Sequence, residues 1–379
     1  MAVTGRRAVL HLADYGGAYS GNFVASLRAL SGPCDALGLR LAFAFSESKV
    51  ARPWIDALRA GGTPVHLLRR EGSLSERTSA VGRISTEENA AILHSHFGTY
   101  DLPATLAAAR GGQQVVWHMH SPLDEVRPLH AVAKDAIKLR VFGRSAHAAA
   151  VSTAILEEAI RHGFPAARAS YIPNGVDLAH ATGTSLGRDE LRRQFGIAPS
   201  QRVMLAFGWD PLRKGIDVIL DAAAALARDG GDRLLLLVGT ERLHELLAAR
   251  FGGTLPAWLR TIAPQQHVGD LYAAADAFVS ASRVEGFPYA LGEALANGLP
   301  SVVSDIPGVE WAREVGAARF FTSGDAASLA DGLRDVTSWT AAEIAPRAAE
   351  AKAFARDRLS LSAWAGRVAQ VYRTALEMA

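Results

Sequence analysis

The amino-acid sequence predicts an α/β fold with two parallel β-sheets. Short apolar segments alternate along the chain with Ala- and Leu-rich segments at helical spacing, which is typical of parallel strands buried on both faces by helices. This alternation stops near residue 178 and begins again at Arg202. Two such series in 379 residues indicate two domains, since a domain commonly has about 100–200 residues.

The first series contains seven predicted strands and ends at the turn Pro173–Gly175. We expect residues 1–178 to form the N-terminal, Rossmann-like domain, and the polar, Gly-rich residues 179–200 to form a linker. Helices are predicted at Phe23–Leu30 and Pro103–Ala109. The predicted strands are Ala8–Leu12, Leu39–Phe45, Val65–Leu68, Ile92–His96, Val115–His118, Ala148–Val151 and Ser170–Ile172.

The second series predicts another Rossmann-like domain over residues 201–355. A terminal helix at Trp364–Met378 lies in the remaining segment, 356–379, which could cross back to the N-terminal domain. Two such domains facing each other would leave a cleft lined by the loops at the carboxyl ends of the strands. The predicted strands are Val203–Phe207, Leu234–Val238, Ala277–Ser280 and Ser301–Val303, with helices at Ile216–Ala227 and Tyr289–Ala296.

Composition and charge exclude several classes of protein. Apolar residues make up 49% and charged residues 21%, which is ordinary for a globular chain. The net charge of +2, without a polybasic cluster, gives no reason to expect nucleic acid as a partner. The longest apolar runs, such as Leu234–Val238, are far shorter than the ~18–20 residues of a membrane-spanning helix. We see no signal peptide, and the single cysteine, Cys34, fits a reducing compartment, so we expect a cytoplasmic location.

Peripheral contact with a membrane stays open as an alternative. His130, Lys134 and Lys138 recur at four-residue spacing, which could form a lipid-facing stripe. A solvated helix face is the favoured interpretation of the same spacing.

A predicted helix N-terminus carries two carboxylates. Pro288 suits the first turn of a helix, and unpaired backbone N–H groups at Gly286 and Phe287 would favour an anion such as phosphate. Glu285 before the helix and Glu293 within it could accept hydrogen bonds from sugar hydroxyls beside that anion. The competing interpretation is structural, namely a negative residue near a helix N-terminus and an exposed helical glutamate.

A lysine follows the first strand of the second series. Lys214 is one of five lysines among 40 basic residues, in a chain that otherwise uses arginine. It lies with Arg213 in the loop at the carboxyl end of the strand. Because a compact ammonium suits phosphate, we predict that both cations bind a diphosphate. Solvated loop charges are the alternative.

The loop after the first strand is rich in glycine. Gly16 and Gly17 permit positive φ and a close approach of the backbone to a ligand. Gly16 and Gly21 have the spacing of a P-loop, but Asn22-Phe23 replaces its Lys-Ser/Thr. A plain tight turn explains this loop equally well.

Two His-x-His pairs lie near predicted strand ends. His94 and His96, and His118 and His120, each place two imidazoles on one face of a strand. Such pairs can bind zinc, but no Cys, Asp or Glu completes either pair at convincing spacing, so we expect no metal. His120 leads into a turn and could enter the cleft.

Together these motifs resemble the glycosyltransferase family 4 group of GT-B enzymes. The similarity covers nearly the whole chain, and its motifs are specific for the family but not for a substrate. The glycine-rich loop and His120 match the family less specifically. The match is strongest from Ser200 to Gly308, where it rests on Gly208–Gly215, Leu271–Asp276, Glu285 with Glu293, and Ser304–Gly308. Ile172–Asp177 resembles the family's hinge entry.

The resemblance implies a retaining sugar transfer from a nucleotide-diphosphate sugar, without a metal ion or another cofactor. It implies that Glu293 binds the ribose and that Glu285 holds the donor sugar, beside the backbone of Gly286–Pro288. It also implies that Lys214 binds the diphosphate. Gly16 and Gly17 would approach the same group from the other domain.

The same resemblance places His120 near the sugar and the acceptor and supplies no dedicated base. One departure is that Trp209 stands where the family commonly has an arginine. Arg213 could supply the missing charge, or the chain could be a non-catalytic, nucleotide-sugar-binding homologue. A GT-B nucleotide-sugar epimerase is a further alternative. The acceptor stays open between a small molecule, a glycan and a lipid-linked glycan.

Overall fold

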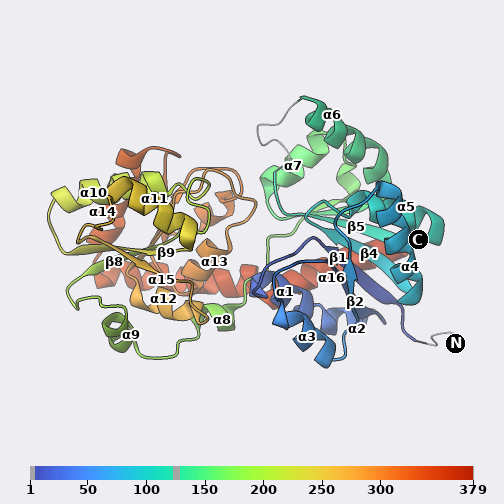
Figure 1. Cartoon of the computed structure of the whole chain (residues 1–379), viewed down its shortest axis with the longest axis horizontal. Coiled ribbons are helices and arrows are strands. Elements are labelled where there is room, and N and C mark those ends of the chain that lie inside the picture. Colours follow the sequence, from blue (N-terminus) through green and yellow to red (C-terminus); the bar gives the residue numbers. More distant parts are fainter. Residues whose placement is uncertain (1–4, 123–128, 379) are drawn as a thin grey trace. The chain divides into compact units, whose positions relative to one another are not determined.

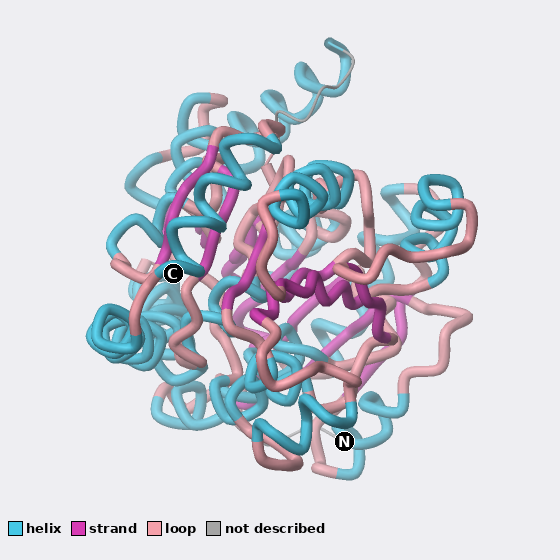
Figure 2. Tube along the Cα trace, turned by 90° about the vertical axis from the view of Figure 1, so that its left-hand side faces the viewer, coloured by secondary structure: helices cyan, strands magenta, loops and turns pink. Residues whose placement is uncertain are grey.

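A computed structural model describes residues 5–122 and 129–378. It divides into two compact units, unit 1 with Met1–Gly175 and Leu361–Ala379, and unit 2 with Val176–Ser360. In each unit a parallel sheet is enclosed by helices (Figures 1 and 2), so the predicted α/β class with two Rossmann-like sheets is confirmed.

The sheet of unit 1 has seven parallel strands in the order β3-β2-β1-β4-β5-β6-β7. The order changes direction between β1 and β4, so the loops after these two strands part to opposite sides and leave a crevice at their carboxyl ends. The strands are β1 (Ala8–Ala13), β2 (Arg40–Ser46), β3 (Val65–Leu68), β4 (Ala90–His96), β5 (Gln114–Met119), β6 (His147–Ala150) and β7 (Ala169–Tyr171).

Helices bury both faces of this sheet, which explains its continuous apolar strands. Within β1, Val9 and Ala13 pack in one core with helices α1 and α16, whereas Leu10 and Leu12 pack in a second core with α4 and α5. The helices of unit 1 are α1 (Gly21–Ala29), α2 (Ser31–Ala36), α3 (Pro53–Ala60), α4 (Leu74–Glu87), α5 (Asp101–Gly111), α6 (Leu129–Ile137), α7 (Thr153–Arg161) and α16 (Leu361–Glu377).

The sheet of unit 2 has six parallel strands in the order β10-β9-β8-β11-β12-β13, and its direction changes between β8 and β11. The strands are β8 (Arg202–Phe207), β9 (Arg233–Val238), β10 (Leu259–Ile262), β11 (Ala277–Ser280), β12 (Ser301–Ser304) and β13 (Ala318–Phe321). The helices are α8 (Leu178–Thr182), α9 (Arg188–Gln194), α10 (Ile216–Arg228), α11 (Glu241–Phe251), α12 (Val268–Ala274), α13 (Tyr289–Ala296), α14 (Ala326–Ser338) and α15 (Ala341–Phe354).

The eleven strands predicted from the sequence all form, with ends that differ by at most two residues. The two that were missed, β10 and β13, are the edge strands of unit 2. Each carries a half-buried arginine, Arg260 or Arg319, and so breaks the continuous apolar pattern that marks a central strand.

The predicted linker, residues 179–200, is wrong as a description of this segment. It forms most of α8 and all of α9, both of which belong to unit 2. Ser185 Oγ donates to Asp270 Oδ2 (2.7 Å), and Asn297 Nδ2 donates to Ala181 O (2.9 Å). The segment also packs closely on α12: a Cβ on Gly269 would lie 2.1 Å from Gly183 O.

Residues 356–379, predicted as one C-terminal segment, belong to two different units. The segment up to Ser360 belongs to unit 2, where Val176 N donates to Leu359 O (2.7 Å). Helix α16 belongs to unit 1 and buries Trp364 and Tyr372 in its core.

A lipid-facing stripe does not fit the position of Lys138. Its ammonium donates to Asp101 Oδ2 (2.6 Å), and the side chains of both residues are largely buried. The side chain of His130 lies outside the described residues. In the ranges 5–122 and 129–378, no helix has the length and hydropathy needed to cross a bilayer.

We predict that Gly269→Ala destabilises unit 2 by about 1–3 kcal/mol, because the new methyl group would overlap the backbone of Gly183. Urea denaturation would measure the loss. Gly366→Ala is the matched control: this exposed glycine of α16 has open space around it, so alanine should raise stability by about 0.5–1 kcal/mol. Equal effects of the two substitutions would contradict the packing of Gly183 on α12.

Candidate active site

The predicted site residues lie at the carboxyl edges of the two sheets, around the points where the strand order changes direction. In unit 2 they follow β8 and β11, and in unit 1 they follow β1 and β5. Parallel sheets bind ligands at these crevices. The topology therefore gathers, within each unit, residues that are far apart in the sequence.

In unit 2, the loop that carries Lys214 is fixed by the glycine that follows it. Gly215 has φ +61°, and a Cβ at this position would lie 2.1 Å from Ala281 O. Only glycine therefore allows the loop after β8 to rest against the loop after β11. The backbone of Arg283 strengthens this contact, because its N–H donates to Arg213 O (2.9 Å).

This contact brings Lys214 to Glu285, 71 residues further along the chain. Lys214 Nζ donates to Glu285 Oε1 at 2.5 Å, and Ser282 Oγ donates to the same oxygen at 2.8 Å. Glu285 is 7% exposed. A carboxylate held by two donors in a buried site has a fixed orientation. Within residues 5–122 and 129–378, both donors bind Oε1 and none binds the second oxygen.

Trp209, the residue that departs from the family pattern, lies beside both cations. Its ring centre is 5.2 Å from Lys214 Nζ and 6.0 Å from Arg213 Cζ, which is within the range of cation–π attraction. The tryptophan is half exposed. Arg213 is half-buried, and its Nε donates to Val284 O (3.4 Å), so it is not a freely solvated charge.

The residues Gly286, Phe287 and Pro288 lead into α13 as predicted. The helix begins at Tyr289, with Pro288 immediately before it. Gly308 packs directly against the backbone of this turn, since a Cβ there would lie 2.3 Å from Glu285 O. Phe287 stacks on Trp311 with ring centres 4.8 Å apart.

Glu293 lies one turn inside α13 and is buried, so the interpretation of it as an exposed helical residue is wrong. Tyr272 of α12 donates its hydroxyl to Glu293 Oε2 (2.7 Å). Burial, together with the Glu293 charge and hydrogen bond, raises the pKa of Tyr272 well above its usual value. The phenol thus stays a donor and orients the carboxylate.

In unit 1, the glycine-rich loop follows β1. Neither Gly16 nor Gly17 has positive φ, so the expected use of that freedom is wrong here; Gly21, at the start of α1, has it instead. Gly17 O accepts a hydrogen bond from Trp54 Nε1 (3.0 Å), and a Cβ on Gly17 would lie 3.1 Å from the ring of Tyr15. The loop therefore packs closely on aromatic side chains.

The two His-x-His pairs converge at the same edge of unit 1, where a fifth histidine joins them. His11 of β1 lies opposite His94 of β4, and His96 lies opposite His118 of β5. We call these residues, with His120 and Tyr372, the histidine network. Burial is the main cause that lowers the pKa of all five histidines, to about 3 for His11 and His118 and well below 6.5 for the others.

Two triples of this network have the spacing of metal ligands. One nitrogen from each of His11, His94 and His96 lies within 4.8 Å of the others, and the same holds for His96, His118 and His120. These nitrogens also face one another at hydrogen-bond distance. The expectation that the protein uses no metal stays a prediction.

A strained aromatic residue packs on His120. Phe97, directly after β4, has φ +62°, which is rare for a bulky side chain and is found mostly at functional sites. Its ring stacks on His120 with centres 4.4 Å apart, and Phe23 meets His120 edge-on at 5.9 Å. His120 itself is partly exposed.

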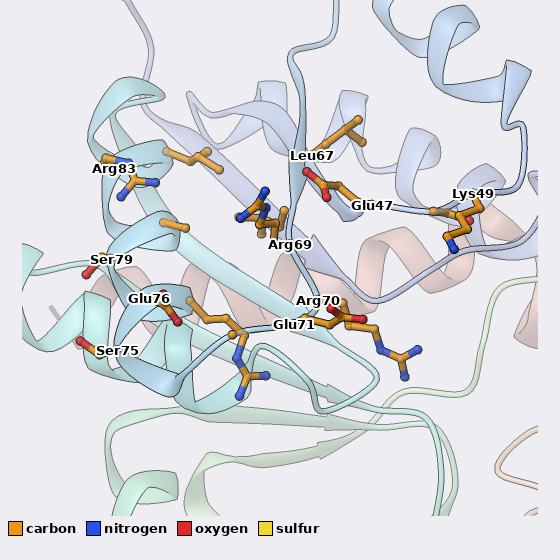
Figure 3. Close-up of a pocket in the computed structure, with 16 residues that line it drawn as sticks. Glu47, Lys49, Leu67, Arg69, Arg70, Glu71, Ser75, Glu76, Ser79 and Arg83 are labelled. Carbon is orange, nitrogen blue, oxygen red and sulfur yellow. The ribbon is translucent and has the colours of Figure 1, made fainter.

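A basic pocket of about 1170 Å³ opens on unit 1 (Figure 3). Helix α4 forms one wall, with Glu76 and Arg83, and the segment after β3 forms another, with Arg69 and Arg70. Arg70 Nε lies 3.0 Å from Asp14 Oδ2, which connects the pocket to the loop after β1. Its basic residues are Lys49, Arg69, Arg70, Arg77 and Arg83, against the carboxylates of Glu47, Glu71 and Glu76.

Two family profiles match this chain without overlap. Residues 40–180 match "Glycosyltransferase Family 4", and residues 187–351 match "Glycosyl transferases group 1". The chain belongs to glycosyltransferase family 4. A curated relative, the D-inositol 3-phosphate glycosyltransferase of Actinosynnema mirum, is 29% identical over 315 residues, which cover 74% of this chain and 73% of the relative.

Solved structures show that this family 4 glycosyltransferase has the GT-B fold. Anabaena HepE in complex with UDP aligns with a TM-score of 0.79 at 20% identity, over 97% of this chain and 100% of that one. A glycosyltransferase from Rickettsia africae aligns with a TM-score of 0.81 at 15% identity, over 99% and 100%.

Sequence reasoning missed several residues of this glycosyltransferase. His11 and Tyr372 come from opposite ends of the chain, and only the fold brings them together. A histidine inside the apolar strand Ala8–Ala13 was the one available signal for His11. Tyr272 lies within Leu271–Asp276, a segment that resembles the family, yet its hydroxyl contact with Glu293 requires the packing of α12 on α13.

We predict that the glycosyltransferase loses stability as the pH falls below about 6.5. The folded-state pKa values of the buried histidines lie below their unfolded value, so the unfolded chain binds more protons between pH 6.5 and 3. The stabilisation is complete above pH 6.5 and decreases by about 1.4 kcal/mol per pH unit for each proton taken up.

Urea denaturation at pH 7.5, 6.5 and 5.5 would measure this dependence. His118→Gln removes one buried titrating group and should make the decrease shallower by about one proton. A free energy of unfolding that stays constant down to pH 5.5 would show that the network is not buried as described.

Proposed function

We propose that this glycosyltransferase moves a sugar from a nucleotide-diphosphate sugar to an acceptor hydroxyl, with retention at the anomeric carbon and without a metal ion. The contact of Lys214 with Glu285 carries the proposal. A cation and a carboxylate are placed side by side at the crevice of unit 2, beside the N-terminus of α13. A diphosphate and a sugar require this combination of charges.

In this proposal each site residue has a separate task. Lys214 and Arg213 hold the diphosphate, together with the backbone N–H groups of Gly286 and Phe287. Glu285 accepts hydrogen bonds from the sugar hydroxyls. Glu293, oriented by Tyr272, accepts those of the ribose, while Gly16, Gly17 and His120 are the predicted contribution of unit 1.

The reaction breaks the bond between the anomeric carbon and the diphosphate oxygen and forms a bond from the acceptor oxygen on the same face. The acceptor hydroxyl gives its proton to the departing diphosphate, so no protein base is consumed. Negative charge on the diphosphate grows as the bond breaks. Fixed cations therefore stabilise the transition state more than the bound donor.

A uridine nucleotide is the first donor to test, because HepE was solved in complex with UDP and with UDP-glucose. For the acceptor we propose a phosphorylated polyol. Two observations support it: several curated relatives are D-inositol 3-phosphate glycosyltransferases, and the pocket of unit 1 has five basic side chains against three acidic ones.

Thermal unfolding with UDP-, GDP-, ADP- and dTDP-sugars would test the donor. A ligand that binds the folded protein raises the melting temperature by mass action. Transfer to inositol phosphates would then be followed with the sugar that binds, in excess EDTA and with nuclear magnetic resonance to identify the anomer formed. Loss of turnover in EDTA with recovery on adding Mg²⁺, or an inverted product, would contradict the proposal.

Two controls separate the proposed glycosyl transfer from an epimerase and from a non-catalytic homologue. Epimerisation of the donor in the absence of any acceptor would support the epimerase. Donor binding without transfer to any acceptor would support the non-catalytic homologue.

We predict that Lys214→Ala lowers kcat by about a hundred- to a thousandfold, the usual effect of removing one preorganised donor. Lys214→Arg should restore activity only in part, because the guanidinium is longer and planar. Initial rates at saturating donor would measure both. Turnover like that of the wild type in Lys214→Ala would refute this assignment.

Arg213→Ala should lower kcat by about one to two orders of magnitude if Arg213 supplies the positive charge that the family's arginine would provide at position 209. The double variant Arg213→Ala, Lys214→Ala decides whether both act on one group: losses well short of additive indicate a shared role. If Arg213→Ala leaves kcat nearly unchanged, Lys214 binds the diphosphate and Arg213 does not.

For the acceptor, we predict that Arg69→Ala combined with Arg83→Ala raises KM for a phosphorylated polyol about tenfold or more and leaves kcat nearly unchanged. Charge-assisted hydrogen bonds to phosphate contribute about 1.5–3 kcal/mol each. Arg193→Ala, an exposed arginine of unit 2, is the control. An unchanged KM would exclude the basic pocket as the acceptor site.

A further inference from the structure

The six side chains of the histidine network form one continuous series of contacts. His118 Nδ1 lies 3.3 Å from His94 Nε2, and His94 Nδ1 lies 2.6 Å from the Tyr372 hydroxyl. That hydroxyl is 3.4 Å from His11 Nε2, and His11 Nδ1 is 3.0 Å from His96 Nε2. The last contact joins His96 Nδ1 to His120 Nε2 at 3.1 Å.

Every imidazole between the two ends uses both of its nitrogens in this series. A neutral imidazole has one N–H donor and one acceptor nitrogen, and the phenol can donate and accept. Each contact needs one donor and one acceptor. The Tyr372 oxygen could accept from both His94 and His11, but its own buried O–H would then have no partner in the series, which is costly. The phenol therefore donates to one neighbour and accepts from the other, so that all contacts run in the same direction and two arrangements of the protons remain.

The two ends decide between these arrangements. His118 Nε2 is buried and, among the residues that the structure describes, has no hydrogen-bond partner. In one arrangement this atom carries an unsatisfied N–H, and in the other it is a bare acceptor. An unsatisfied buried N–H is the costlier and rarer of the two. The other end, His120, is partly exposed and can bind a ligand or water.

We infer that the histidine network fixes His120 as a neutral Nδ1–H tautomer, so that His120 donates a hydrogen bond to an oxygen of the substrate instead of acting as a base. Each residue donates to the next in the order His118, His94, Tyr372, His11, His96 and His120. Each of the five histidines therefore carries its proton on Nδ1. His96 and the residues behind it are positioning residues for His120. The part of this inference that concerns substrate rests on the proposed function.

Two further observations support this role. Burial keeps all five imidazoles neutral at pH 7, since it lowers the pKa of each well below 6.5. The strained Phe97 and the edge of Phe23 hold the ring of His120 in place. A donor is also what a reaction without a protein base requires, because the growing negative charge lies on substrate oxygens.

The tautomers can be measured without substrate. In ¹⁵N-histidine-labelled protein, two-bond ¹H–¹⁵N correlation spectra distinguish Nδ1–H, Nε2–H and the imidazolium, and single His→Gln variants assign the signals. We expect Nδ1–H for all five histidines of the network from pH 8 to 5.5. Free histidine favours Nε2–H, so the exposed His244 of unit 2 serves as the reference.

Two variants of His96 test whether the network sets the tautomer of His120. His96→Leu removes the donor to His120 Nε2, and His120 should change to a mixture of both tautomers. His96→Gln can accept from His11 through its carbonyl and donate to His120 through its amide, so it should restore Nδ1–H. If either variant fails to fold, the tautomers of the wild-type protein still decide the inference.

The inference is overturned if His120 or His96 of the wild-type protein is the Nε2–H tautomer, or if His120 stays Nδ1–H in His96→Leu. It is also overturned if protein purified without an affinity tag contains about one equivalent of zinc, because a metal would then set the tautomers. Failure of sugar transfer alone would reject the proposed function and leave these measurements unchanged.

Discussion

The geometry of the candidate active site in unit 2 depends on one close backbone contact, that of Gly215 with Ala281 O. This contact joins the loops after β8 and β11 where the strand order changes direction. Lys214 and Glu285 can meet only because the residue between Lys214 and α10 has no side chain. Gly308 makes an equivalent contact under Glu285. The charged pair is thus a product of backbone packing, and its geometry is fixed before any ligand binds.

In unit 1, the change of strand order between β1 and β4 lies beside the histidine network. Unit 1 buries four imidazoles and a phenol, with the partly exposed His120 at the end of the series, among apolar side chains, where an unpaired polar group would be costly. The mutual contacts of the six groups satisfy all but one buried nitrogen of the series. Such a satisfied network specifies a single arrangement of side chains, whereas a partly satisfied one would loosen the core.

The sequence was sufficient to predict both sheets and eleven of their strands, because central parallel strands leave continuous apolar segments. It was sufficient to predict the family because several motifs resemble it. It was insufficient where tertiary contacts decide the outcome. Residues 179–200 are polar and Gly-rich, yet they pack on α12 and α13. His11 and Tyr372 lie in no motif, and Tyr272 lies in one that does not reveal its contact with Glu293. Their importance follows from which strands and helices become neighbours. The glycines at 16 and 17 were correctly located in a loop, but their backbone conformation depends on Tyr15 and Trp54.

Helix α16 has a consequence for how the protein is made. It supplies Trp364 and Tyr372 to the core of unit 1, although 185 residues of unit 2 are synthesised between them and Gly175. On the ribosome, unit 2 therefore has its whole sequence available first. The N-terminal segment, which emerges earliest, must wait with the part of its sheet that α16 covers exposed until residues 361–377 leave the exit tunnel. Delayed burial of this face makes unit 1 the part of the nascent chain that most needs protection from aggregation.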